Sequence, residues 1–286
     1  MKSCLFLLLC LTFSPFLQSN AQSKIPALGI CSSYENDSLV HATGLEYIEE
    51  TVRKMLAPSV SEDVFNSRLS ILKNAATKIQ TCNLFIPAEI KVIGPDVNEK
   101  RVLGYVDSVM QRAKIAGIRL IVLGSGGARK IPDGVDHATA KKAFIKLARK
   151  MAVVAAKYDC MIAMENLNAS ETNFVNSIEE GNEIVNAVRH PNFKLTVDIY
   201  HMLRENEPAA HIEKARGNIV HCHIAEKEKR TAPGVMGDDF KPYLAALKKI
   251  NFQGRIMMEC RWGTLATEIQ PATAYLKAQL EEVYGK

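Results

Sequence analysis

Residues 160–168 read CMIAMENLN, an apolar run that ends abruptly at the carboxylate of Glu165. A short apolar run bounded by polar residues is typical of a strand buried in a parallel sheet. A carboxylate placed directly after such a strand needs a partner, because burying an unpaired charge costs free energy. The segment therefore predicts a buried strand with a polar site at its carboxyl end.

The same pattern recurs along the chain. Short apolar runs alternate with longer segments that carry one apolar stripe at helical spacing on a charged surface. This alternation predicts a parallel sheet with helices between the strands. We expect strands at residues 27–31, 44–49, 82–86, 118–123, 160–164, 193–197, 219–224 and 255–258. We expect helices at residues 67–81, 98–116, 139–157, 177–188, 240–250 and 270–284.

Eight strand candidates favour a single closed (β/α)8 TIM barrel over an open, doubly wound sheet, which is the alternative architecture. With 47% hydrophobic and 23% charged residues, the chain can bury a large core. A net charge of +5 without a long basic run argues against a nucleic-acid-binding surface. We expect the barrel domain to occupy residues 22–286.

The first 21 residues have the pattern of a cleaved signal peptide. Lys2 precedes an apolar run over residues 5–17, and small residues precede a cut after Ala21. The run is too short to span a bilayer, so we expect an exported mature protein, periplasmic or secreted, without a membrane span. The five cysteines beyond the cut are odd in number and lie in or beside predicted strands, which predicts free thiols. They are Cys31, Cys82, Cys160, Cys222 and Cys260.

Four chemically reactive side chains end four consecutive predicted strands. They are Glu165, Asp198, His223 and Glu259. In a barrel of this kind the active site is built from the carboxyl ends of several strands, so the four can converge. Three carboxylates and one imidazole suit manganese, magnesium or cobalt better than a thiolate-type zinc site, although zinc stays an alternative. We therefore expect them to bind one divalent metal ion.

The motifs around these residues resemble the xylose isomerase-like TIM barrel superfamily, the sugar phosphate isomerase/epimerase group. Within it they are similar to D-tagatose and D-psicose 3-epimerases. The resemblance runs from about Glu165 to Glu259, whereas the N-terminal half matches only in general pattern. The matching motifs are ENLN at 165–168, DIYHM at 198–202, HCH at 221–223, PG at 233–234 and ME at 258–259.

The resemblance also implies roles for residues around the metal ligands. Glu171 and His201 are expected to contact the substrate. The related enzymes carry an arginine six residues after the ligand histidine; that position is Lys229 here, and Arg230 follows, so either can serve. His221 faces the same side of its strand as His223, and we favour a supporting or core role over ligation.

Two further positions have competing interpretations. The segment GSGGAR at 124–129 resembles a recurrent loop of this superfamily, in which Arg129 would contact a polar substrate or a phosphate. The alternative is a flexible loop at the barrel rim. Trp262, close to Glu259, either stacks on a sugar face or belongs to the core.

The implied function is a divalent-metal-dependent isomerase or epimerase acting on a small carbohydrate. Glu165 and Glu259 would exchange a proton next to a ketose carbonyl, through an enediolate that the metal stabilises. The ligand set does not choose between epimerisation and aldose–ketose isomerisation. The alternatives are a 3-keto-glycoside lyase or epimerase of the same superfamily and a non-catalytic sugar-binding protein. The sequence leaves the oligomeric state open, with a homodimer or a homotetramer as the alternatives to a monomer.

Overall fold

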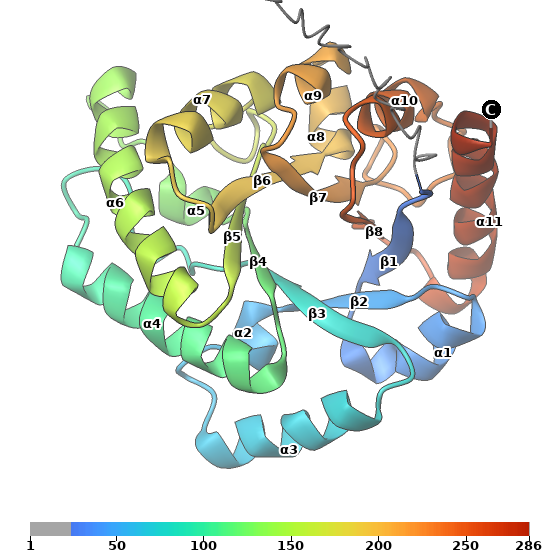
Figure 1. Cartoon of the computed structure of the whole chain (residues 1–286), viewed down its shortest axis with the longest axis horizontal. Helices are drawn as coiled ribbons and strands as arrows, with labels where there is room; N and C mark the ends of the chain where they lie inside the picture. Colours follow the sequence, from blue (N-terminus) through green and yellow to red (C-terminus); the bar gives the residue numbers. More distant parts are fainter. Residues whose placement is uncertain (1–23, 286) are drawn as a thin grey trace, which may run out of the picture.

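The computed structural model describes residues 24–285. They form a closed barrel of eight parallel strands in the order β1 to β8, with helices around it (Figure 1). This confirms the expected single (β/α)8 barrel over the open sheet. The strands are β1 (Ala27–Cys31), β2 (Tyr47–Thr51), β3 (Lys78–Asn83), β4 (Leu120–Leu123), β5 (Met161–Glu165), β6 (Phe193–Asp198), β7 (Ile219–Ile224) and β8 (Arg255–Met258). The predicted signal peptide lies outside the described residues.

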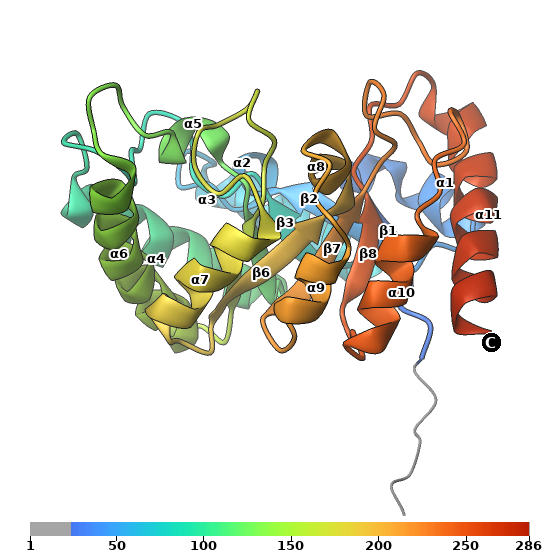
Figure 2. The ribbon, with the colours of Figure 1, turned by 90° about the horizontal axis from the view of Figure 1, so that it is seen from above.

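The helices divide into long ones that cover the barrel and short ones near its ends. The long helices are α3 (Glu62–Asn74), α4 (Glu99–Ala116), α6 (His137–Lys157), α7 (Ile178–Val188), α10 (Lys241–Lys249) and α11 (Leu265–Tyr284). The short ones are η1 (Tyr34–Asn36), α1 (Asp37–Ala42), α2 (Val52–Met55), α5 (Gly126–Arg129), α8 (Ile199–Arg204) and α9 (Ala210–Lys214). Figure 2 shows α2, α5 and α8 at the end of the barrel where their preceding strands finish.

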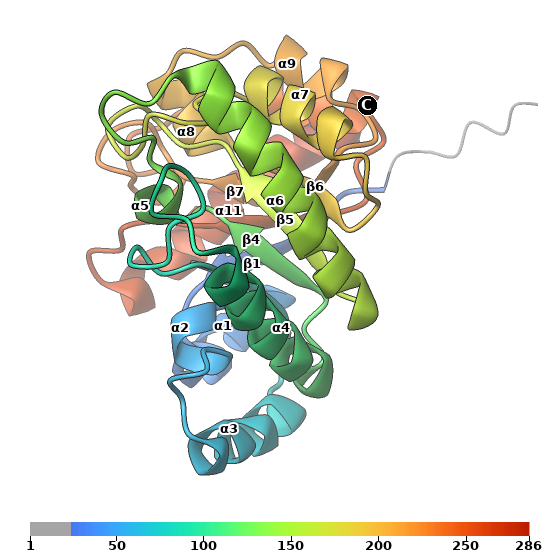
Figure 3. The same ribbon diagram turned by 90° about the vertical axis from the view of Figure 1, so that its left-hand side faces the viewer.

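The main core lies between the strands and the surrounding helices. Helices α4 and α6 pack side by side against the sheet, and α3 lies further out (Figure 3). Phe65 is the one buried residue of α3, whereas α6 buries seven of its residues. No helix within residues 24–285 is long and apolar enough to cross a membrane. Nor does any of the five described cysteines form a disulfide.

The expected boundaries are wrong in the first third of the barrel. The predicted helix at 67–81 is α3 at 62–74, and the predicted strand at 82–86 is β3 at 78–83. Ser61 caps the start of α3 by accepting a hydrogen bond from the N–H of Val64. The carboxylate of Asp37 accepts the main-chain N–H groups of Ala76 and Thr77, each at 2.8 Å, and so holds the chain extended where β3 begins.

Candidate active site

The four predicted metal ligands meet at the carboxyl end of the barrel. Glu165 is the last residue of β5, Asp198 the last of β6, His223 lies near the end of β7, and Glu259 follows β8. One ligand atom from each can be chosen so that all four lie within 4.8 Å of one another. Asp198 and His223 are fully buried, and Glu165 is 5% exposed. Neighbouring strands of the closed barrel therefore bring together groups that are far apart in the sequence.

Asn166 fixes the ends of β5 and β6 relative to each other. Its side-chain oxygen accepts the main-chain N–H of Asp198 at 2.8 Å, and its amide nitrogen donates to the main-chain oxygen of Asp198 at 3.1 Å. The carboxylate of Asp198 in turn caps α8 by accepting the N–H of His201 at 3.1 Å. These bonds set the directions in which Glu165 and Asp198 project.

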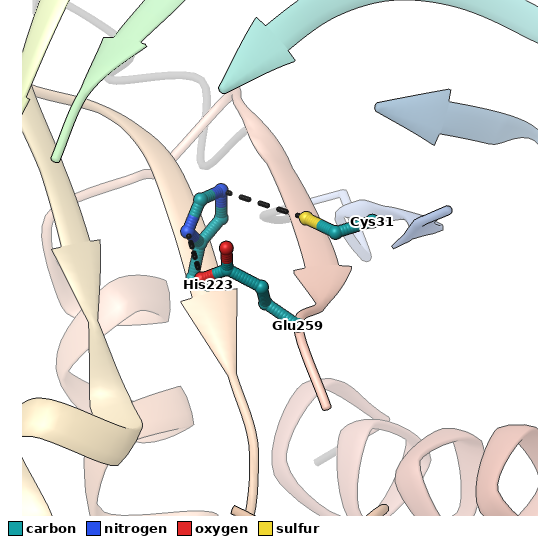
Figure 4. A group of neighbouring side chains, drawn as sticks. All are labelled: Cys31, His223 and Glu259. Atoms are coloured by element: carbon teal, nitrogen blue, oxygen red, sulfur yellow. Dashed lines mark hydrogen bonds and ion pairs between the residues drawn. The ribbon is translucent and has the colours of Figure 1, made fainter. Parts of the chain in front are cut away.

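His223 lies at the centre of the cluster, with contacts to both of its ring nitrogens. Its Nδ1 atom lies 2.6 Å from Oε1 of Glu165 and 3.0 Å from Oε2 of Glu259. Its Nε2 atom lies 2.8 Å from Oε1 of Glu49, on β2. Figure 4 shows the ring between Glu259 and Cys31, with each residue facing a different ring nitrogen.

Arg230 supplies positive charge to the same cluster. Its Nη2 atom contacts the Glu259 carboxylate and lies 3.3 Å from Oδ2 of Asp198, while Nη1 lies 3.8 Å from Glu171. The guanidinium stacks over the ring of Tyr200, 4.7 Å from its centroid. Lys229 is exposed, so the structure brings Arg230, and not its neighbour, to the ligand cluster.

The buried groups shift one another's ionisation. Burial raises the pKa of Asp198 to about 6, although Arg230 opposes the shift. Burial likewise raises the pKa of Glu165. Burial would also raise the pKa of Glu259, but His223 and Arg230 outweigh it and hold that pKa at about 2. The two carboxylates proposed to move protons thus have unlike environments.

A divalent cation suits the residues present. Three of the four groups offer carboxylate oxygen and one offers imidazole nitrogen, a set that divalent metals accept. Three carboxylates crowded in a buried place need positive charge beside them. In this structure His223 and Arg230 provide it, and an ion held by Glu165, Asp198, His223 and Glu259 would provide it directly.

His201 is a buried donor beside this cluster. Its Nδ1 atom accepts the main-chain N–H of Asn168 at 3.0 Å, which places the proton of the neutral ring on Nε2. Burial lowers the pKa of His201 to about 4. Nε2 lies 3.5 Å from Oδ2 of Asp198 and has no hydrogen-bond partner among the described residues. The atom is therefore available to a ligand oxygen.

The predicted contact residues Glu171 and Trp262 differ in their surroundings. Glu171 is partly exposed and accepts a hydrogen bond from the amide of Asn168 at 3.3 Å. Trp262 packs partly buried against the core, and its Nε1 atom has no hydrogen-bond partner within residues 24–285. The predicted stacking of Trp262 on a sugar stays a prediction.

Arg129, which was expected to contact a polar substrate or a phosphate, lies in the protein interior. Its side chain is fully buried, donating from Nε to the main-chain oxygen of Gly124 and from Nη2 to that of Glu165, both at 2.6 Å. Burial lowers its pKa to about 10. Arg129 ties the ends of β4 and β5 together, because its guanidinium donates to one main-chain oxygen at each. Its predicted contact with a polar substrate or a phosphate stays a prediction.

Comparison with known proteins places this chain in a family. The family model described as xylose isomerase-like TIM barrel matches residues 38–281. The chain belongs to this family. A curated relative, D-psicose 3-epimerase of Enterocloster bolteae, is 30% identical over 130 residues, which are 44% of this chain and 43% of the relative. The match thus spans less than half the length of that relative.

Two solved structures of the family's fold are also similar. D-psicose 3-epimerase from Clostridium cellulolyticum H10, solved with D-tagatose, has a TM-score of 0.77 at 21% identity, covering 90% of this chain and 99% of that one. The 3-keto-D-glucoside 4-epimerase from Escherichia coli has a TM-score of 0.74 at 18% identity, covering 88% and 99%. At these identities the likeness shows the shared barrel.

Three buried residues of the candidate site escaped the sequence analysis. Glu49, on β2, contacts both His221 and His223. Asn83, the last residue of β3, donates from Nδ2 to Oε1 of Glu259 at 3.0 Å. Glu226, beyond β7, accepts main-chain N–H groups from the loop that follows Arg230, among them those of Gly234 at 2.7 Å and Gly237 at 2.9 Å. Their partners are remote in sequence or are main-chain groups, so no motif marks them.

Proposed function

We propose that this chain is a divalent-metal-dependent sugar epimerase or isomerase that moves a proton at the carbon next to a ketose carbonyl. The observation that carries the proposal is the convergence of Glu165, Asp198, His223 and Glu259 on one buried point. The curated ketose 3-epimerase relative supports the substrate class. Manganese, cobalt and magnesium are the ions that the donor set favours, with zinc also acceptable.

The ligand residues would hold the ion, which, when bound, would polarise the substrate carbonyl and stabilise an enediolate. Glu165 and Glu259 perform the proton transfers: one carboxylate removes the proton from the carbon, and the other returns a proton. Return to the same carbon from the opposite face inverts it, which is epimerisation. Return to the neighbouring carbon gives aldose–ketose isomerisation.

The remaining side chains bind and orient the sugar. His201 offers its unpartnered Nε2–H to a substrate oxygen. Arg230 and Glu171 lie at the open side of the cluster, where a hydroxyl group can meet a donor and an acceptor together. Because Arg230 also contacts Glu259, it couples substrate binding to the position of a proton-transferring carboxylate.

A second candidate function is the epimerisation or elimination of a 3-keto glycoside. It is favoured by the structural likeness to 3-keto-D-glucoside 4-epimerase and uses the same proton transfer. We propose in addition that the protein is exported, since residues 1–21 have the composition of a signal peptide. An exported enzyme would meet free sugars and glycosides more readily than sugar phosphates.

Solvent-deuterium exchange tests the proposed chemistry. The metal-free protein is reconstituted with Mn²⁺ and incubated in D₂O with a panel of free ketoses and 3-keto glycosides. We expect deuterium at one carbon of one substrate class, and that carbon identifies the reaction. Glu259→Gln should still bind the sugar but lose turnover. A sugar that binds without any exchange would instead identify a non-catalytic binding protein.

A further inference from the structure

A second cluster lies on the far side of the His223 ring from the proposed metal ligands. It consists of Cys31 on β1, Glu49 on β2 and His221 on β7. Glu49 is 1% exposed and His221 is 1% exposed. In the closed barrel β2 pairs with β1 and β3, so the contact from Glu49 to β7 crosses the barrel interior. Nothing in the proton-transfer chemistry described above uses this cluster.

Glu49 is the centre of the cluster. Its Oε1 atom lies 2.8 Å from Nε2 of His223 and accepts the thiol of Cys31 at 3.4 Å. Its Oε2 atom lies 2.8 Å from Nε2 of His221, an ion-pair contact without the alignment of a hydrogen bond. A buried carboxylate between two imidazoles accepts hydrogen bonds and donates none.

This arrangement decides which nitrogen of His223 can bind a cation. Oε1 of Glu49 already accepts the thiol of Cys31, so it faces Nε2 of His223 as an acceptor, and Nε2 carries its hydrogen on that side. Nδ1 is then the nitrogen whose lone pair is available once it has lost its proton. Nδ1 is also the atom beside Glu165 and Glu259. We propose that Glu49 is a positioning residue that fixes the tautomer and orientation of His223, with His221 and Cys31 holding the Glu49 carboxylate in place.

The thiol of Cys31 could instead be read as a metal ligand, since Cys31, His223 and Glu259 also lie close together. Figure 4 argues against this reading, because Cys31 and Glu259 face different nitrogens of the ring. The sulfur lies 3.9 Å from Nε2 of His223, and its hydrogen bond goes to Glu49. Cys31 therefore belongs to the Glu49 side of the ring and not to the side where the carboxylates gather.

Glu49 can act in this way only if the chain binds a metal as proposed above, so the test measures metal binding directly. Metal-free protein is titrated with Mn²⁺, and free Mn²⁺ is counted by electron paramagnetic resonance. Glu49→Leu removes the acceptor at nearly constant volume, and Glu49→Gln keeps a neutral acceptor oxygen. Glu50→Gln is the matched control, because Glu50 is a buried carboxylate on the same strand whose oxygens accept the N–H groups of Tyr34 and Thr51.

We expect Glu49→Leu to weaken Mn²⁺ binding by about tenfold to a hundredfold, Glu49→Gln by less, and Glu50→Gln by under about threefold. Thermal melting of the metal-free proteins shows whether each variant folds. If Glu49→Leu does not fold, the Mn²⁺ affinity of Glu49→Gln is compared with that of the wild type instead. With diamagnetic Mg²⁺ or Zn²⁺ bound, long-range ¹H–¹⁵N spectra of histidine-labelled protein should show His223 protonated at Nε2 in the wild type and a mixture of forms in Glu49→Gln.

Two results overturn the inference. Wild-type affinity for Mn²⁺ in folded Glu49→Leu and Glu49→Gln would leave Glu49 a purely structural residue. Metal bound through Nε2 of His223 in the wild type would reverse the assigned geometry. A wild-type protein that binds none of these ions would instead refute the proposed function, and this inference with it.

Discussion

Arg230 contacts both the main chain and the side chain of Glu259: its Nε donates to the main-chain oxygen at 2.9 Å, and its Nη2 contacts the side-chain carboxylate. The main-chain oxygen belongs to the segment leaving β8, and the carboxylate belongs to the ligand cluster. One guanidinium therefore fixes where Glu259 leaves the strand and where its charge lies. Only a planar side chain with several directed donors can make both contacts at once.

Replacing Arg230 by Lys should therefore impair catalysis without unfolding the protein. A lysine ammonium keeps the charge but cannot bond both oxygens of Glu259 and reach Asp198. We expect kcat/KM to fall about a hundredfold, as for the loss of one directed donor at a reaction centre. Steady-state kinetics on the substrate found by deuterium exchange provides the measurement. Lys229→Ala, at the exposed neighbouring position, should stay within about twofold of the wild type. An equal loss in both variants would contradict this assignment.

The absence of a side chain at Gly124 makes room for Glu165. A Cβ atom at this position would overlap Oε2 of Glu165. We expect Gly124→Ala to push the carboxylate away, lowering kcat at least tenfold and stability by about 1–3 kcal/mol. The control is Gly104→Ala on the exposed face of α4, where an added Cβ would meet nothing beyond its own helix within 4 Å. This change should be neutral or stabilise by about 0.5–1 kcal/mol. Equal kcat values for Gly124→Ala and the wild type would show that Glu165 relaxes without cost.

Sequence patterns predicted the barrel well wherever a single periodicity dominated. The strand ending at Glu165 is apolar up to that residue, and the strand ending at Asp198 alternates apolar residues with Lys194 and Thr196, so the limits of both were predicted within a residue or two. In the first third, Leu69, Leu72, Ala76 and Ile79 keep helical spacing across the boundary between α3 and β3. The helix ends there because Asp37 binds the main chain at Ala76 and Thr77, a contact between distant segments that periodicity cannot reveal.

The residues of the candidate site were also predicted only in part. The four proposed ligands could be predicted because each ends a strand, and barrel geometry brings strand ends together. The role of Glu49 could not be predicted. It lies beside Glu50 in a strand whose two adjacent carboxylates suggest exposure to solvent, and its partners on β7 are more than 170 residues away in the sequence. The burial of Arg129 could not be predicted either, because its partners are main-chain oxygens that carry no sequence signature.

Asn83 should matter through Glu259. It donates to Oε1 of Glu259 at 3.0 Å while Arg230 contacts Oε2, so each carboxylate oxygen has its own donor. Removing this donor by Asn83→Ala should lower kcat about tenfold. Asn83→Asp should be worse, since it sets a second carboxylate against Glu259. Kinetics and melting curves of both variants provide the check, and a milder effect of Asp than of Ala would rule out the hydrogen bond as the cause.

Asp37 should make stability depend on pH at a place remote from the site. Burial opposes its ionisation, but hydrogen bonds from Thr77 and Ala76 lower its pKa. A carboxyl group whose pKa is lower in the folded than in the unfolded state stabilises the fold above its unfolded pKa, and this contribution is lost as pH falls through the folded pKa. Urea unfolding should therefore show wild type more stable than Asp37→Asn at pH 7, with the difference shrinking on acidification below about pH 4. A difference independent of pH would contradict the assignment.

Metal binding should be visible as stabilisation, independently of any substrate. An ion that binds only the folded state at a hundred times its Kd adds about 2.7 kcal/mol, which for a chain of this size raises Tm by about 5 °C or more. Asp198→Asn removes a charged ligand, yet an asparagine oxygen can still accept the N–H of His201 and cap α8. This variant should fold but show a shift below about 1 °C at the same Mn²⁺ concentration. An undiminished shift in Asp198→Asn would mean that the ion binds elsewhere on the protein.

Arg230 contacts the carboxylates of Asp198 and Glu259 and neutralises them, so a bound ion must displace it. Arg230→Gln should therefore bind Mn²⁺ at least as tightly as the wild type.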